Sequence, residues 1–267
     1  MTQFDLNFVE KLPLKECAAL VSGQDFWFTA KGKAYPSIQV SDGPSGLRKQ
    51  DDQADALRVN QSVDAICFPS SAVTASSFDD HLLYQLGQQL GIAARAEKIA
   101  FLLGPGINIK CSTLAGRNFE YFSEDPLLAG WMGAAYVKGV QSQGVGVSVK
   151  HFAANNRENQ RFTSSSNVDE RTLCEIYLSA FERIVKQAHP ATLMCSYNKI
   201  NGTLNSQNER LLTTILRNQW GFQGMVMSDW GAVADHVAAI KAGLDLEMPG
   251  KGKYSVDEIV DVFMMDD

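Results

Sequence analysis

A carboxylate follows a short apolar run in the segment Gly-Met-Val-Met-Ser-Asp-Trp-Gly over residues 224–231. The run Met225–Met227 lacks the polar alternation of a half-exposed strand, so we predict a strand buried on both faces. Asp229 would then lie at the carboxyl end of that strand, where barrel enzymes hold their reacting groups, beside a tryptophan able to stack on a sugar or a base. Serine and aspartate also end strands by starting turns, and these few residues alone favour that simpler explanation.

Polar side chains stand at the ends of nearly all the other predicted strands. Taken singly, each of these residues has an ordinary structural explanation. Lys150 could be a solvated residue at a strand end, and His151 and Tyr197 could be core residues whose polar atoms are hydrogen-bonded. Their joint position is harder to explain by packing, because the carboxyl ends of barrel strands meet at one mouth. The strand-end groups are Asp42, Ser70-Ser71, Asn108, Lys150-His151, Tyr197-Asn198, Asp229 and Glu247.

The elements that must position these groups are short apolar runs that alternate with amphipathic helices. The predicted strands are residues 37–40, 65–68, 99–103, 145–149, 192–195, 225–227 and 244–246. Alternating strands and helices predict a parallel sheet with right-handed crossovers. The number of repeats favours an α/β, TIM-like (β/α)8 barrel, irregular or incomplete in places, over an open sheet. Gly104-Pro105-Gly106 lacks the third glycine and the helix start of a dinucleotide-binding loop, so we interpret it as a turn.

Two helices are predicted most clearly. Residues 79–97 follow a cap at Ser76 or Ser77, and the clearest periodicity covers residues 172–186, with Asn167 and Glu170 as a capping box and Pro190 beyond its end. The apolar face of the first helix comprises Leu82, Leu83, Leu86 and Leu90. That of the second comprises Leu173, Ile176, Tyr177, Ala180, Phe181, Ile184 and Val185.

Composition narrows the function classes. The 267 residues are 45% hydrophobic, enough for a sizeable core, and the net charge of -6 without a basic stripe argues against nucleic acid as a partner. No apolar run is long enough to cross a bilayer and no signal peptide is recognisable, so we expect no membrane partner and a cytoplasmic location. The cysteines are Cys17, Cys67, Cys111, Cys174 and Cys195, an odd, scattered set that indicates a reducing compartment and small core thiols, with no metal or cofactor.

Several ordered motifs make residues 26–249 resemble the N-terminal barrel domain of glycoside hydrolase family 3, the β-glucosidase and β-xylosidase family. The motifs are Ser-Asp-Gly-Pro-Ser-Gly-Leu-Arg (41–48), Gly-Pro-Gly-Ile-Asn (104–108), Gly-Arg-Asn-Phe-Glu-Tyr-Phe-Ser-Glu-Asp-Pro (116–126), Lys-His-Phe-Ala-Ala-Asn-Asn (150–156), Cys-Ser-Tyr-Asn (195–198) and Ser-Asp-Trp (228–230). No single motif is decisive, but six in register are highly specific. The resemblance implies one barrel domain over residues 1–267, with residues 251–267 as a terminal helix.

The resemblance also implies site residues and their roles. Asp229 would be the catalytic nucleophile of a retaining glycosidase, forming a glycosyl-enzyme ester that water later cleaves. The residues expected to bind the β-linked glucoside or a related small saccharide are Asp42, Arg48, Arg117, Lys150, His151, Arg161, Tyr197 and Trp230. Nearby basic groups would keep Asp229 ionised.

Two further expectations concern neighbours in the chain. Because consecutive strand residues point to opposite faces, Lys150 and His151 can share a pocket only through a bulge or an unusual peptide. The acidic residues of the Arg117 motif, Glu120, Glu124 and Asp125, are expected to form internal salt bridges or helix caps that hold the Arg117 loop.

The family pattern leaves the second carboxyl group unassigned. Retaining hydrolysis needs an acid/base roughly 5 Å from the nucleophile, and in the multidomain members it comes from an α/β-sandwich domain after the barrel. Here the chain ends with an apolar helical face over residues 256–264 and with Asp266 and Asp267, so it resembles a truncated or split product. The single-domain hexosaminidase branch uses a loop histidine instead, and residues 152–166 contain none.

Four functions therefore stay open. The first is a β-glycosidase barrel that needs an acid/base from an absent domain, supplied within a longer protein or by a separate chain. The second is a complete glycosidase that recruits Glu158, Glu170 or another loop carboxylate. The third is a Schiff-base lyase that uses Lys150. The fourth is a non-catalytic or partner-dependent sugar-binding subunit.

Overall fold

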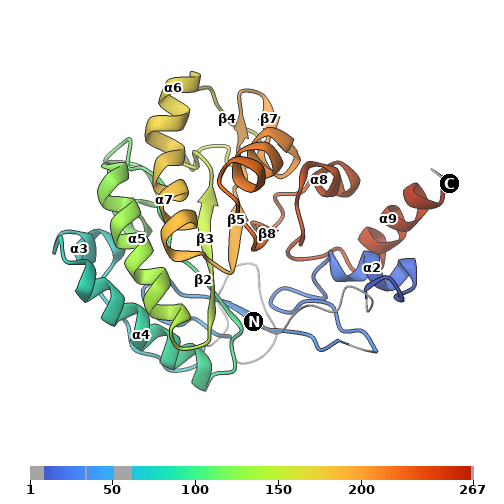
Figure 1. The fold of residues 1–267 in the computed structure, drawn as a ribbon, viewed down its shortest axis with the longest axis horizontal. Coiled ribbons are helices and arrows are strands. Elements are labelled where there is room, and N and C mark those ends of the chain that lie inside the picture. The colour runs from blue at the N-terminus through green and yellow to red at the C-terminus, as the bar shows by residue number, and fades with distance from the viewer. Residues whose placement is uncertain (1–8, 34, 51–61, 266–267) are drawn as a thin grey trace.

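Five parallel strands form the central sheet of the protein, whose computed structural model describes residues 9–33, 35–50 and 62–265 (Figure 1). Their order is β1-β2-β3-β5-β8. The bounds are Val40–Asp42 for β1, Phe101–Leu103 for β2, Gly146–Phe152 for β3, Thr192–Cys195 for β5 and Met225–Ser228 for β8. β3, β5 and β8 are buried along almost their whole length, as expected of parallel strands covered by helices.

Isolated bridges close this sheet into a ring. Beyond β8, successive bridges join Met227 to Leu246, Glu247 to Ser22, Gly23 to Thr29 and Phe28 to Gln39, which leads directly into β1. The first two bridges are parallel and the last two are antiparallel. The predicted α/β barrel is therefore confirmed, and its irregular part lies where the N-terminal segment meets the chain after β8.

Helices surround the ring (Figure 1). The helices before β5 are α3 (Ser71–Ala75), α4 (Asp80–Ala96), η1 (Asn118–Glu120), α5 (Pro126–Gln141), α6 (Glu170–Thr172), η2 (Leu173–Leu178) and α7 (Ser179–Ala188). Those after β5 are η3 (Asn205–Gln207), η4 (Arg210–Gln219), α8 (His236–Ala242) and α9 (Lys253–Met265), the last packing against α8 and against α2 (Leu14–Leu20). A small second sheet contains β4 (Ser165–Ser166), β6 (Lys199–Ile200) and β7 (Thr203–Leu204).

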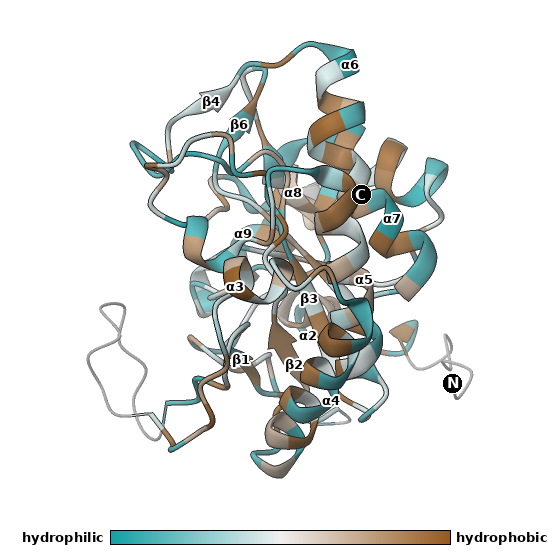
Figure 2. Cartoon of the chain, turned by 90° about the vertical axis from the view of Figure 1, so that its left-hand side faces the viewer, coloured by the Kyte–Doolittle hydropathy of each residue, from teal (hydrophilic) through white to brown (hydrophobic). Residues whose placement is uncertain are grey.

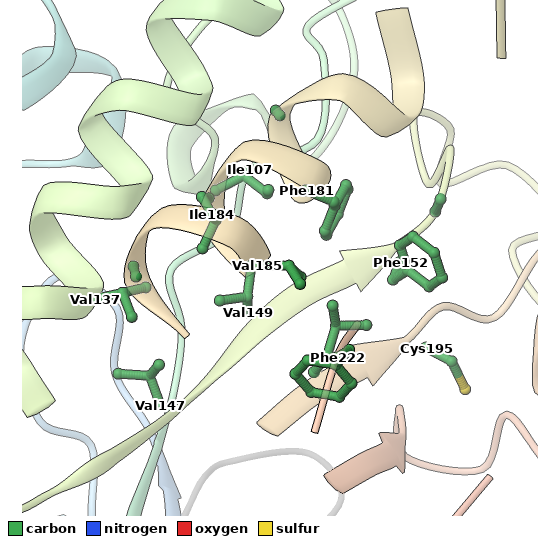
Figure 3. Packing of buried hydrophobic residues seen from close by; sticks show 14 of the residues in the cluster. Ile107, Val137, Val147, Val149, Phe152, Phe181, Ile184, Val185, Cys195 and Phe222 are labelled. Carbon is green, nitrogen blue, oxygen red and sulfur yellow. The ribbon is translucent and has the colours of Figure 1, made fainter. Parts of the chain in front are cut away.

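Apolar side chains of β3 meet α7 in the main core. Phe152 contacts Phe181 edge-on with ring centroids 5.2 Å apart. Figure 3 shows Val147, Val149 and Phe152 of β3 beside Phe181, Ile184 and Val185 of α7. Hydrophilic and hydrophobic residues alternate along the outer helices α4 and α7 (Figure 2), so each of these two helices turns one face to the core and the other to water. Within the described part of the chain, no helix combines the length and apolar character that crossing a bilayer requires.

The predicted strand over residues 65–68 was wrong. This segment has no strand partner, and Ile66 is 68% exposed. Its backbone instead supports the loop after β1, where the Phe68 N–H donates to the Ser45 carbonyl oxygen over 2.8 Å. The strand predicted at residues 244–246 is reduced to the bridge at Leu246, and the strand predicted at residues 37–40 begins only at Val40.

Both predicted helices exist, but their caps and parts of their apolar faces differ from the prediction. Asp79 caps α4 by accepting from the Leu82 N–H, because Phe78, with φ 54°, separates α4 from α3. Asp169 caps α6 in place of the predicted capping box at Asn167 and Glu170. The side chains of Leu82 and Ile176 are exposed rather than packed in the core.

The thiols and the C-terminal helix also differ in part from expectation. Cys195 is buried, whereas Cys67, Cys111 and Cys174 are exposed and so are not core residues. The C-terminal helix α9 buries Ile259, while Phe263 and Met264 remain exposed at its end. Asp266 and Asp267 lie outside the described residues.

Candidate active site

A cleft of about 1030 Å³ opens at the carboxyl ends of the strands. It brings together side chains that follow or end β1, β3, β5 and β8. The predicted site residues that line it are Asp42, Arg48, Arg117, Lys150, Arg161, Tyr197 and Trp230. The other two, His151 and Asp229, are buried and reach the cleft residues through Arg117 and Tyr197. Asp229 and Lys150 therefore share one end of the barrel, as predicted.

Asp229 lies directly after β8 and is only 6% exposed. Its backbone N–H donates to the Cys195 carbonyl oxygen over 3.0 Å, which ties it to the end of β5. Oδ1 accepts the Trp230 N–H at 2.8 Å. Oδ2 is 3.5 Å from His151 Nε2 and makes no well-aligned hydrogen bond within the described residues. One carboxylate oxygen is thus anchored, and the other faces the His151 ring.

Different parts of the surroundings of Asp229 shift its pKa in opposite directions. Burial raises the pKa of Asp229, whereas the charge of Arg117, the Tyr197 hydroxyl and the charge of Lys150 lower it. Burial and the negative charge of Asp229 raise the pKa of Tyr197, so this phenol stays a hydrogen-bond donor. The cations and the phenol thus favour the ionised carboxylate, whereas burial favours the neutral acid.

Arg117 connects the buried layer to the cleft. Its Nε donates to Glu120 Oε1, and its Nη2 donates to His151 Nε2 at 2.8 Å. The Glu120 pairing confirms the predicted internal salt bridge, and Asp125 caps α5 as predicted. Glu124 is exposed and has no ion-pair partner among the described residues.

His151 differs in charge from its cationic neighbours. It is 1% exposed, and burial, together with the positive charges of Arg117, Lys150 and Arg161, lowers its pKa well below the ordinary value. Of the basic groups expected near Asp229, Arg117 and Lys150 are the ones whose charge lowers its pKa. Burial first, and then the three nearby cations, make the pKa of His151 favour the neutral ring.

The peptide between Lys150 and His151 is cis, and the register between β3 and β5 shifts at this point. The predicted irregularity is confirmed. Asn108 holds the irregular backbone: its Nδ2 donates to the His151 carbonyl oxygen at 2.9 Å and its Oδ1 accepts the His151 N–H at 2.8 Å. Lys150 Nζ then reaches Asp42 Oδ1 at 2.9 Å and Glu120 Oε2 at 3.8 Å.

The loop after β1 places Asp42 and Arg48 on one wall of the cleft. The Arg48 N–H donates to the Asp42 carbonyl oxygen over 2.9 Å. Gly43 and Gly46 have φ of 134° and 141°, and a Cβ on Gly43 would stand 2.2 Å from the Gly46 carbonyl oxygen. Only glycine fits this turn, which explains its place in the motif.

Aromatic rings form the opposite wall. The Arg161 guanidinium lies 5.0 Å from the Tyr197 ring centroid and pairs with Glu158 Oε2 at 3.0 Å. Trp230 is fixed by its indole N–H, which donates to the Phe26 carbonyl oxygen at 2.9 Å. Planar faces beside polar groups suit the apolar face and the hydroxyl edge of a sugar.

The two carboxylates considered as substitute acids have other partners. Glu158 lines the cleft but lies between Arg161 and Arg117, the latter 3.9 Å away. Glu170 pairs with Arg210 and lines a separate cavity of about 240 Å³ between η2 and η4. Glu170 therefore does not belong to the cleft.

Four residues near the cleft were not assigned a site role from the sequence. Asn108 and Tyr121 position His151 from behind, and Phe119 and Phe162 line the cleft while 65% and 56% exposed. Asn108, Phe119 and Tyr121 lie within the ordered motifs, and this position was the feature of the sequence that could have identified them as site residues. Contacts between segments far apart in the chain cannot be deduced from motif order alone.

A family model described as "Glycosyl hydrolase family 3 N terminal domain" matches residues 52–265 of this chain. Among curated proteins, the chain is 52% identical over 257 residues to thermostable beta-glucosidase B of Acetivibrio thermocellus, covering 96% of this chain and 34% of that protein. It is 49% identical over 263 residues to the exo-alpha-(1->6)-L-arabinopyranosidase of Bifidobacterium longum, covering 97% and 34% respectively. The chain thus spans about a third of the length of these relatives.

Solved structures agree with the sequence relatives. A GH3 beta-glucosidase from Bifidobacterium adolescentis superimposes with a TM-score of 0.89 at 49% identity, covering 96% of this chain and 36% of that one. Beta-glucosidase 3B from Thermotoga neapolitana, in complex with glucose, superimposes with a TM-score of 0.88 at 40% identity, covering 97% and 39% respectively.

Proposed function

Because this chain belongs to glycosyl hydrolase family 3, whose N-terminal domain it carries, we propose that it forms the sugar-binding part of a retaining β-glycosidase and supplies Asp229 as the nucleophile. The observation that carries this proposal is the Asp229 carboxylate, buried at a strand end with Oδ1 anchored and Oδ2 unbonded. Attack by Oδ2 on the anomeric carbon would give a glycosyl-enzyme ester that water later cleaves.

The other site residues would bind the glycone. Lys150 and Asp42, paired at 2.9 Å, can exchange part of that pairing for sugar hydroxyl groups. Arg117, Arg48 and Arg161 add donors, His151 adds a neutral ring, and Trp230 and Tyr197 add apolar faces. We propose a β-linked glucoside as substrate, since beta-glucosidases dominate the relatives; an α-L-arabinopyranoside is the competing substrate.

The described carboxylates that line the cleft are poor candidates for the acid/base. Asp42 is paired with Lys150, Glu120 with Arg117, and Glu158 with Arg161. We propose that the proton donor belongs to a further segment or a separate chain. The Lys150 ammonium is held by two carboxylates, which suits a binding cation better than the desolvated amine of a Schiff-base lyase.

The test is covalent labelling with a 2-fluoroglucoside that carries a 2,4-dinitrophenyl leaving group, followed by peptide mapping. Label on Asp229, its loss in Asp229→Ala and its retention in the exposed control Glu124→Ala would support the proposal. Label on another carboxylate would refute the assignment. Glucose binding without any label would favour a non-catalytic sugar-binding subunit.

A further inference from the structure

The contacts of His151 decide which ring nitrogen carries its proton. Arg117 Nη2 lies 2.8 Å from His151 Nε2, and a guanidinium group can only donate. Nε2 must therefore accept through its lone pair. Since burial and the nearby cations keep the ring neutral, its single proton is on Nδ1.

Tyr121 supplies the partner for that proton. Its hydroxyl oxygen is 3.2 Å from His151 Nδ1, and its own O–H is directed to the Asn155 carbonyl oxygen, 3.4 Å away. With its proton committed to Asn155, the hydroxyl accepts from Nδ1. Burial raises the pKa of Tyr121 well above the ordinary value, so the phenol stays neutral. The two rings also meet edge-on with centroids 6.0 Å apart.

The position of the proton matters because Nε2 faces Asp229. Asp229 Oδ2 is 3.5 Å from Nε2, and two lone pairs at that separation form no hydrogen bond. In the opposite tautomer, Nε2–H would oppose the Arg117 donor and would turn toward Oδ2. A hydrogen bond to Oδ2 would stabilise the carboxylate before attack more than during it, because its charge falls as the ester forms.

We propose that Tyr121 is a positioning residue that holds His151 as the Nδ1-protonated tautomer, so that His151 donates no hydrogen bond to Asp229 Oδ2 before attack. The inference rests on the proposed nucleophilic role of Asp229. Its first part, the tautomer, is measurable without turnover, so the two proposals can fail separately.

The primary test is ¹⁵N NMR of the full chain with labelled histidine. The chain has four histidines, so the ring signals are few, and His151→Gln identifies those of His151. We expect a protonated Nδ1 and an unprotonated Nε2 throughout about pH 5 to pH 8, where an ordinary histidine titrates. A protonated Nε2 in the wild type within that range, as tautomer or imidazolium, would overturn the proposal.

The second test compares two variants that each remove one buried hydroxyl group. Tyr121→Phe should raise the fraction of Nε2-protonated His151 and slow labelling of Asp229 by the 2-fluoroglucoside about tenfold, the effect of one hydrogen bond gained by Oδ2 before attack. Tyr136→Phe, whose hydroxyl donates to the Pro44 carbonyl oxygen, should leave the His151 tautomer unchanged. An unchanged tautomer in Tyr121→Phe would contradict the proposal even if Asp229 labels normally. Absence of label in the wild type would count against the nucleophile alone.

Discussion

Burial makes ionisation of Asp229 unfavourable for the stability of the folded protein. Its pKa is raised by burial, so at pH values between the unfolded and folded pKa the native state binds more protons than the unfolded state, and stability falls as the pH rises. This direction is the reverse of that of a salt-bridged surface aspartate. A carboxylate whose charge is stabilised only in part would suit the nucleophilic role proposed for Asp229.

Removing this charge should stabilise the protein. We expect Asp229→Asn to unfold at a higher urea concentration than the wild type at pH 7, because the amide avoids the burial cost of the charge. The two unfolding curves should converge below about pH 4, near the pKa of an unfolded aspartate. Glu124→Gln, on an exposed side chain, should match the wild type at each pH. A wild type that gains stability over Asp229→Asn as the pH rises would contradict the pKa direction.

Asn108 supports the site through the backbone of His151. Asn108→Ala would leave a buried N–H and a buried carbonyl group unpaired, at about 1–3 kcal/mol each. We expect lower stability and at least a tenfold weaker affinity for glucose, measured by calorimetry, because Lys150 and His151 both depend on this backbone.

Asn201 offers a matched control for this prediction. Its side chain makes the same two hydrogen bonds to a backbone, that of Val168, at 2.8 and 2.9 Å, but it is exposed and does not line the cleft. Asn201→Ala should leave the affinity for glucose unchanged. Equal losses of affinity in both variants would mean that Asn108 acts only through general stability.

At the scale of elements, the conformation of the loop between β1 and Arg48 requires glycine at position 46. A Cβ on Gly46 would lie 2.5 Å from the Ile66 carbonyl oxygen, and this backbone cannot move without shifting the loop. Gly46→Ala should therefore destabilise the protein by about 1–3 kcal/mol and weaken binding of glucose.

Gly144→Ala is a control that distinguishes a steric clash from the cost of a positive φ. Gly144 also has a positive φ, 78°, but a Cβ there would meet nothing within 4 Å. Gly144→Ala should show the cost of the left-handed backbone alone and should bind glucose normally. Comparison of urea unfolding and calorimetric titrations for the two variants tests the argument, and equal glucose affinities would contradict it.

The sequence predicted the regular elements better than the irregular ones. β3, β5 and β8 contain short apolar stretches and are buried along most of their length, and their strand-end residues could be predicted to share one mouth. The strand expected at residues 65–68 failed because a short apolar run on the surface has the same composition as a buried one. The bridges that close the barrel, such as that between Ser22 and Glu247, join distant segments and carry no local pattern.

The charge states of the site residues also depend on contacts between distant segments, which the sequence does not reveal. The residue types around Asp229 were predicted, but the neutrality of His151 depends on its burial and on cations from three segments. The pairing of Glu158 with Arg161 and Arg117 likewise followed only from the fold. The sequence states the type of each side chain, whereas its protonation state depends on the groups that pack around it in the fold.

At the scale of the whole molecule, the chain carries the cleft proposed to bind the sugar but spans only about a third of the length of its relatives. Each described carboxylate at the cleft serves a cation there. A nucleophile without a nearby proton donor should still cleave a substrate whose leaving group needs no proton. The ratio of the turnover rates of substrates with good and with poor leaving groups therefore shows whether the chain holds its own acid/base.

We expect the isolated chain to turn over alkyl β-glucosides poorly and 2,4-dinitrophenyl β-glucoside better, because acid/base assistance contributes about 10² to 10⁴ in rate and dinitrophenolate departs without it. Hydrolysis of the glycosyl-enzyme should then be slow for want of a base. Azide, which needs no base, should accelerate turnover and yield a β-glucosyl azide, with Asp229→Ala as the inactive control. The same assay with a dinitrophenyl α-L-arabinopyranoside ranks the competing glycone. Efficient alkyl glucoside hydrolysis that azide leaves unchanged would show that the chain contains its own acid/base.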